Sequence, residues 1–141
     1  MGNAAQFAAE LDAFGMEIEV EALAHKREVS LELLAGCVFG TPVGNPRLWK
    51  RKAPKGYVGG FHRGQWQLTI STPAEAEVSL RTPQDVLSEA DGVVLTLEEP
   101  AWVANNGPAI TRLEYDGHSR QAPDGWVRAV VERLKAKHGA D

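Results

Sequence analysis

The sequence predicts an α+β fold: a long N-terminal helix packed on a small antiparallel β-sheet, with a C-terminal helix and a long Gly/Pro-rich loop. Three observations predict it. Apolar residues between Met16 and Val38 recur every three or four positions, as on one face of a helix. Short alternating runs follow between positions 65 and 105, as in half-buried strands. A last helical stripe lies between Trp126 and His138, where the final turns are basic and complement the helix dipole.

The N-terminal helix is expected to end at Gly40, because Thr41-Pro42 follows and does not continue a helix. The segment Met16–Val20 also alternates, so a short strand remains an alternative there. Cys37 lies among apolar residues, which favours a buried packing thiol over a reactive one. A lone cysteine forms no disulfide within the chain, so nothing indicates an oxidising compartment.

The middle of the chain contains candidate strands and short helices. Thr82 is the expected N-cap of a helix reaching Ala90, with Pro83 in its first position and Asp85 near its start. A second short helix is expected over Pro108–Tyr115. Four segments are expected to form one antiparallel sheet: residues 65–71, 77–81, 93–97 and 101–105.

Length and composition indicate one soluble globular domain spanning residues 1–141. The chain is 43% hydrophobic and 24% charged, with no internal repeat. Its net charge of -4 gives no global reason to expect a nucleic-acid binder. No apolar run approaches the ~20 residues of a membrane span, and the first ten residues do not resemble a signal peptide. We therefore expect no membrane partner.

The segment 40–64 is expected to be an extended basic loop, because it holds six glycines and three prolines. Connections longer than ~15 residues are usually functional or disordered. The loop carries six basic residues, and no acid occurs between Glu32 and Glu75. The loop has a net charge of +6, and the whole chain has a net charge of -4, so the remaining residues carry a net charge of -10. The candidate contact residues are Pro42, Asn45, Pro46, Arg47, Trp49, Lys50, Arg51, Lys52, Lys55, Tyr57, Phe61 and Arg63.

The residues alone leave three interpretations of this loop open. Its cations and aromatic rings are suited to phosphate contacts and base stacking on a nucleic acid. They are equally suited to an acidic surface of a neighbouring subunit. The third interpretation is a solvated loop whose aromatic side chains fold back on the core.

No catalytic or metal-binding pattern is apparent, so the protein is expected not to be an enzyme and to need no cofactor. The four histidines, His25, His62, His118 and His138, lack the spacing of metal ligands. No phosphate-binding Gly-Lys-Ser/Thr motif is present. Glu114, Asp116 and His118 are close enough in sequence for acid–base chemistry, but a polar turn between two helices is the favoured interpretation.

Two blocks of sequence carry a resemblance to a family. The first block contains Thr-Pro-Val-Gly-Asn-Pro at 41–46, Leu-Trp-Lys at 48–50, Ala-Pro-Lys-Gly-Tyr-Val-Gly-Gly at 53–60 and Arg-Gly-Gln-Trp at 63–66. The second spans 105–128, and its motif residues are Asn105, Asn106, Pro108, Arg112, Glu114, Tyr115, His118, Gln121, Pro123 and Arg128. In order and spacing, both blocks resemble the neck and tail-completion proteins of tailed bacteriophages.

The resemblance implies a structural virion protein of the tail and neck, assembled in the host cytoplasm. Such proteins form rings, often hexameric, that complete the tail and join it to the capsid connector. The implied partners are other copies of the chain, the tail tube and neck or connector proteins, with passive contact to DNA or the tape-measure protein in the lumen. Two alternatives remain: a terminator that caps the tail tube directly, and a small nucleic-acid-binding protein using the basic loop at 47–63.

Overall fold

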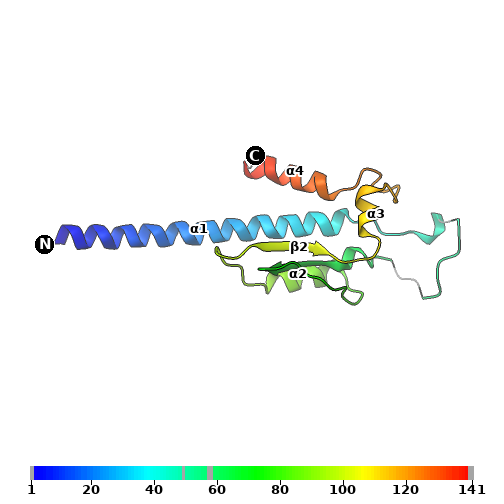
Figure 1. Cartoon of the computed structure of the whole chain (residues 1–141), viewed down its shortest axis with the longest axis horizontal. Coiled ribbons are helices and arrows are strands. Elements are labelled where there is room, and N and C mark those ends of the chain that lie inside the picture. The colour runs from blue at the N-terminus through cyan, green and yellow to red at the C-terminus, as the bar shows by residue number, and fades with distance from the viewer. Residues whose placement is uncertain (1, 49, 57–58, 140–141) are drawn as a thin grey trace.

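The computed structural model describes residues 2–48, 50–56 and 59–139 (Figure 1). The described elements combine helices with one small sheet, so the predicted α+β class is confirmed. In chain order they are α1 (Gly2–Gly40), β1 (Trp66–Ile70), α2 (Pro83–Asp91), β2 (Ala101–Asn105), α3 (Ile110–Tyr115) and α4 (Val127–His138).

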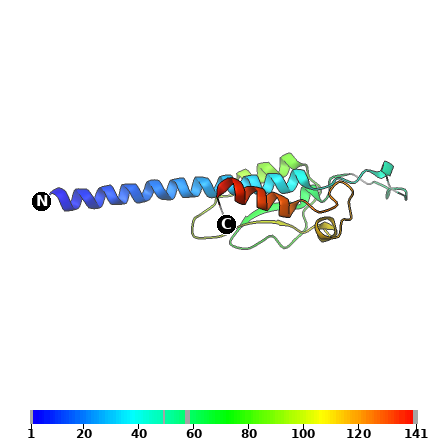
Figure 2. The ribbon, with the colours of Figure 1, turned by 90° about the horizontal axis from the view of Figure 1, so that it is seen from above.

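Helix α1 is longer than the sequence pattern indicated. It is continuous through Met16–Val20, so the alternative of a strand there is wrong. On the helix, Ile18 lies on the side opposite Met16 and Val20, and all three side chains are exposed, so the alternation marks no buried face. The predicted end at Gly40 is confirmed. The N-terminal half of α1 extends beyond the rest of the chain in two perpendicular views (Figures 1 and 2).

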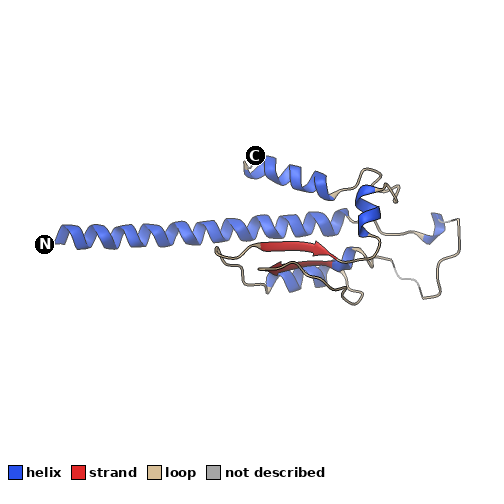
Figure 3. Cartoon of the chain, viewed as in Figure 1, coloured by secondary structure: helices blue, strands red, loops and turns tan. Residues whose placement is uncertain are grey.

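The sheet has only two strands in the described structure. β1 and β2 pair antiparallel, with Trp66 opposite Asn105 and Ile70 opposite Ala101 (Figure 3). The predictions for 65–71 and 101–105 are thus confirmed, whereas the strand at 77–81 is wrong. The side chain of Gln65 binds both backbone groups of Val78, donating to its oxygen (2.7 Å) and accepting from its nitrogen (2.9 Å). A side-chain amide therefore takes the place of a neighbouring strand.

The strand expected at 93–97 is also wrong, because α1 takes its backbone oxygens. Arg27 donates to the backbone oxygens of Val93 (3.3 Å) and Asp91 (3.0 Å). Lys26 donates to the backbone oxygens of Thr96 (2.6 Å) and Glu99 (2.5 Å). Charge-assisted bonds from α1 hold this segment as a loop along the helix.

The shorter helices follow their local sequence. α2 is confirmed with its complete capping box: the Thr82 hydroxyl accepts from the Asp85 nitrogen, and the Asp85 carboxylate accepts from the Thr82 nitrogen. α3 begins at Ile110, two residues later than expected. α4 is confirmed from Val127 to His138. None of the described helices is long and apolar enough to cross a membrane.

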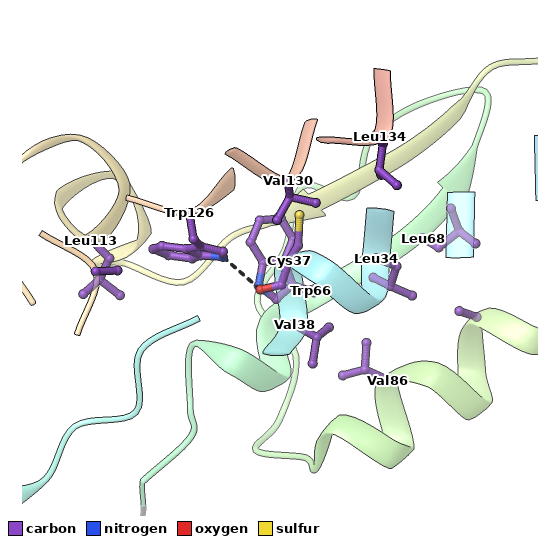
Figure 4. Packing of buried hydrophobic residues seen from close by; sticks show 12 residues of the cluster. Leu34, Cys37, Val38, Trp66, Leu68, Val86, Leu113, Trp126, Val130 and Leu134 are labelled. Atoms are coloured by element: carbon purple, nitrogen blue, oxygen red, sulfur yellow. Dashed lines mark hydrogen bonds between the residues drawn. The ribbon is translucent and has the colours of Figure 1, made fainter. Parts of the chain in front are cut away.

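The core gathers where α1, α4, α2 and β1 meet (Figure 4). Cys37 is buried there, as predicted, and burial with the nearby Glu114 charge raises the pKa of its thiol to about 12. The Trp126 indole donates to the backbone oxygen of Cys37 (2.9 Å), which ties α4 to the last turn of α1 (Figure 4). The largest fully buried side chains are Leu34, Gln65, Val38, Val86, Thr41 and Cys37.

Thr41 closes the C-terminal end of α1. Its hydroxyl donates to the Cys37 oxygen (2.6 Å) and accepts from the indole nitrogen of Trp66 (2.7 Å). The final carbonyls of a helix lack partners within the helix, so such side chains stabilise its end. Thr41 has no exposed surface, and it joins α1 to the start of β1 at the point where the basic loop begins.

Changing Thr41 to Val is expected to lower the free energy of unfolding by about 1–3 kcal/mol, because it leaves the buried Trp66 N–H without an acceptor. Thr41→Ser keeps the hydroxyl and should cost clearly less. Urea denaturation followed by tryptophan fluorescence measures both. Equal stability of the Val and Ser variants would contradict the role given to this hydroxyl.

Candidate assembly interface

The basic loop, residues 40–64, leaves the end of α1 on the side opposite the N-terminus (Figures 1 and 2). Its described part holds only two short 3₁₀ turns, Pro46–Leu48 and Arg63–Gln65, so the expectation of an extended loop is confirmed. The side chain of Asn45 accepts from the Arg47 nitrogen (3.1 Å) and starts the first turn. The conformation of the loop is therefore set by local turns and by the contacts that hold its two ends.

Five of the six loop cations are exposed: Arg47, Lys50, Arg51, Lys52 and Lys55. None of them forms an ion pair with a residue that the structure describes. A cluster of like charges on a projecting loop is unfavourable for the isolated chain and favourable beside an anionic partner. These five side chains are therefore available for contact with another molecule.

Arg63, the sixth cation, has a different role. Its guanidinium donates to the backbone oxygen of Thr41 (2.8 and 3.2 Å) and to that of Phe39 (3.2 Å). These carbonyls lie at the end of α1, where a cation also meets the negative pole of the helix dipole. Arg63 therefore joins the end of the loop to its beginning, and we assign it to positioning rather than to contact with a partner.

The aromatic residues predicted as anchors are only partly described. Phe61 is half-buried and lies edge-on to His62, with ring centroids 5.3 Å apart. Trp49 and Tyr57 lie outside the described residues. Pro42, which is buried, and Phe61 help to line a hollow of about 430 Å³ that is formed mostly by the loop itself.

The second motif holds the base of the loop. The Gln121 side-chain amide pairs with the backbone of Val43, donating to its oxygen (2.7 Å) and accepting from its nitrogen (3.2 Å). At the other end of the loop, Asn105 donates to the backbone oxygen of His62 (2.8 Å), and the Ala109 nitrogen donates to the His62 ring (3.0 Å). The two sequence blocks thus meet in space and fix both ends of the loop.

His62 is a site residue that sequence reasoning missed. Burial lowers the pKa of its imidazole, although the charge of Glu77 acts in the opposite direction. The neutral ring is the form that accepts a hydrogen bond from the Ala109 nitrogen. Gly107 lies so close to the ring that a β-carbon there would collide with it. In sequence, His62 was one of four isolated histidines with no local cue to this role.

Three further residues of the second motif lie beside this base. Asn106 donates to the backbone oxygens of Ala74 (2.8 Å) and Ala76 (3.3 Å), which holds the segment after β1. Pro108 is exposed just before α3, and Pro123 is exposed before α4. Asn106 is thus a structural residue, while the two prolines are on the surface.

Glu114 binds the start of α4. Its buried carboxylate accepts from the backbone nitrogens of Trp126 (2.7 Å), Val127 (3.0 Å) and Arg128 (3.1 Å). The first N–H groups of a helix have no partner within it, and the positive pole of the dipole favours an anion there. Burial alone would raise the pKa of Glu114, but these three donors and Arg128 outweigh it and hold the pKa below its usual range.

Arg128 completes this arrangement from outside. Its guanidinium donates to the Glu114 carboxylate (3.0 Å) and backbone oxygen (2.9 Å), and lies 4.8 Å from the centre of the exposed Tyr115 ring. Arg112, Asp116 and His118 are exposed. Glu114 is directed into the backbone of α4, whereas Asp116 and His118 face solvent, so the three are not brought together as an acid–base group.

Neither a metal cluster nor a known relative identifies the site. Within the described ranges, no three His, Cys, Asp or Glu side chains gather in a way that could hold a metal ion. No protein-family model matches the chain, and neither does any curated protein or solved structure.

The N-terminal half of α1 is a second surface that sequence reasoning missed. From residue 2 to 22, every residue except Gly15 is exposed. Large apolar side chains are among them, including Phe7 (64% exposed) and Phe14 (60%). One stripe follows the three-and-four spacing of a helix–helix contact: Ala4, Phe7, Leu11, Phe14 and Ile18. This spacing was present in the sequence and was the available cue.

Changing Glu114 to Gln is expected to lower the free energy of unfolding at neutral pH by about 1.5–3 kcal/mol, because charge-assisted bonds to buried N–H groups are lost. A carboxyl with a lowered pKa stabilises the fold above its unfolded pKa. That stability is lost as the pH falls through the lower folded pKa, below the ordinary value of 4.5. The wild-type protein should therefore lose stability on acidification more steeply than the variant. Parallel pH profiles in denaturant titrations would contradict this assignment.

Proposed function

We propose that the chain is a structural subunit of a tailed-phage virion. It assembles into a ring at the head–tail junction, completes the tail and joins it to the capsid connector. One observation carries the proposal. The described chain has two projections, the N-terminal half of α1 and the middle of the basic loop (residues 45–48 and 50–56), which lie away from the body of the molecule (Figures 1 and 2).

Both projections are more favourable in an assembly than in an isolated chain. A single helix exposed to water is only marginally stable on its own. Burial of its exposed phenylalanines against another molecule would lower the free energy of the system. The loop, in turn, holds five exposed cations without an ion pair among the described residues. This is the surface expected of a subunit whose neighbours complete its packing.

The resemblance of the two sequence blocks supports the place in the virion. The two sequence blocks that carry the resemblance contact each other at the base of the loop. Gln121 hydrogen-bonds to Val43 there, and Asn105 hydrogen-bonds to His62. The second motif thus presents the loop to a neighbour. The proposed partners are further copies of the chain, the tail tube and the neck or connector proteins, with DNA or the tape-measure protein passing through the lumen.

Electron microscopy of the purified protein is expected to show closed rings, and a labelled copy is expected at the neck of the virion. The physical reason is the pair of uncovered projections, which only a neighbour can cover. A protein that stays monomeric at high concentration and is absent from the virion contradicts the proposal.

Changing Lys50, Arg51 and Lys52 to Glu is expected to leave filled heads and finished tails unjoined, because the loop would repel the acidic surface it contacts. The matched control is Lys50→Arg, Arg51→Lys and Lys52→Arg, which keeps all three charges. Micrographs of lysates and phage yield measure the outcome. Normal yield from the Glu variant would refute a role of this loop in assembly.

The alternative within the same class is a terminator that caps the tail tube directly. Both roles use a ring, and they differ in where the ring lies. Label found on tails isolated without heads supports the terminator role. Label that appears only on joined particles supports a role in joining.

The alternative from a different class is a nucleic-acid-binding protein, which the five exposed cations favour. Contacts between these cations and phosphates would release counterions, so affinity would fall with salt at a logarithmic slope of at most about -4.5 for duplex DNA. Fluorescence anisotropy with random-sequence DNA measures the slope. We expect weak binding for a loop that contacts protein, and tight binding with the full slope would favour the alternative.

A further inference from the structure

The two projections carry opposite charge. The first 25 residues contain five acidic residues and no lysine or arginine. None of the five forms an ion pair with a described residue. The basic loop presents five exposed cations that are likewise free of ion pairs in the described structure. The acidic residues are Glu10, Asp12, Glu17, Glu19 and Glu21.

These two surfaces cannot meet within one chain. The basic loop begins where α1 ends, and it extends away from the N-terminus (Figures 1 and 2). Along a straight helix, Glu21 and Gly40 are about 29 Å apart, at a rise of about 1.5 Å per residue. The acidic segment is farther still from the tip of the loop. Any neutralising partner made of this same chain must be a second copy.

We infer that the basic loop of one copy binds the acidic N-terminal segment of α1 in the next copy. This inference rests on the ring-forming part of the proposed function and names the contact that builds the ring. Each copy binds one neighbour through its basic loop and a second neighbour through the acidic N-terminal segment of its α1. Such a head-to-tail contact closes into a ring when its rotation closes, and otherwise grows as a filament.

The arrangement of charges on α1 favours this contact over pairing of two α1 helices. Glu10, Glu17 and Glu21 each follow an apolar member of the exposed stripe by three residues, so they flank it on one side. In an antiparallel pair of α1 helices, these acidic flanks would face each other across the seam, which is unfavourable. A basic loop against the same flank neutralises the charges instead.

The loop also offers an apolar surface to the exposed stripe. Pro42 and Phe61 of the loop line the hollow together with Leu80 from outside the loop, and Leu80 is 49% exposed. A large side chain of the stripe, such as Phe7 or Phe14, has a chemically matched place there. Charge pairs at the rim and an apolar centre are the usual composition of a protein–protein contact.

Charge reversal with rescue tests the contact. The loop variant carries Lys50→Glu, Arg51→Glu and Lys52→Glu, and the helix variant carries Glu10→Lys, Glu17→Lys and Glu21→Lys. A combined variant carries all six changes. The matched control, Glu75→Lys, Glu98→Lys and Asp116→Lys, makes the same change in net charge as the helix variant, on exposed residues outside both projections. Glutamate and lysine have similar helix propensities, so α1 should persist, which circular dichroism checks.

Sedimentation velocity measures self-association, first at low salt. We expect the loop variant and the helix variant each to raise the dissociation constant of the contact about tenfold or more, since three attractive charges become repulsive. The combined variant, and an equal mixture of the two single-site variants, should restore assembly. The control should assemble like the wild-type protein, and raising the salt to about 0.5 M should weaken assembly of the wild-type protein.

Several results would overturn the inference. They are unchanged assembly of either single-site variant, loss without rescue in the combined variant, and a wild-type protein that does not self-associate. Assembly lost in the helix variant alone would favour pairing of α1 helices. The result is separable from the proposed function. Rescued rings that are absent from the virion neck would refute only the virion role, and rings at the neck that ignore charge reversal would refute only this contact.

Discussion

The C-terminal end of α1 is the constraint on which the rest of the structure depends. The last carbonyls of a helix need donors from elsewhere, and here they come from three separate parts of the chain. Trp126 and the Thr41 hydroxyl take the backbone oxygen of Cys37, while Arg63 takes those of Phe39 and Thr41. The start of α4, the end of the basic loop and, through Trp66, the first strand are thereby fixed to one turn of helix.

The contacts at the end of α1 also require that α1 and α4 pack closely together. A β-carbon added at Gly36 would lie 2.6 Å from Val130, and one added at Gly40 would collide with Trp126. Small residues on α1 therefore let the indole approach the helix end closely enough to reach the Cys37 oxygen. At the far end of α4, Glu32 of α1 binds Lys137 (2.6 Å) and contacts His138 (3.2 Å), so α4 is tied along its length.

Elements determined by adjacent residues could be predicted from the sequence, and those determined by distant contacts could not. The cap of α2 is contained in Thr82–Asp85, and β1 follows from its own alternation. The segment 93–97 has the composition of a strand, yet Lys26 and Arg27, far away in the sequence, take its backbone oxygens. The exposed cations of the loop were apparent from the sequence, whereas the bracing of the loop by His62 depends on the fold.

The buried state of Cys37 has a practical consequence for following the protein in solution. It is the only cysteine of the chain, it is 1% exposed, and burial raises the pKa of its thiol to about 12. Thiolate is the form that reacts with maleimides, so the native sulfur is inert toward such dyes while the chain stays folded. A cysteine introduced on the surface can then carry a single fluorophore without replacing Cys37. Slow labelling of the unaltered chain would in turn report transient opening of its core.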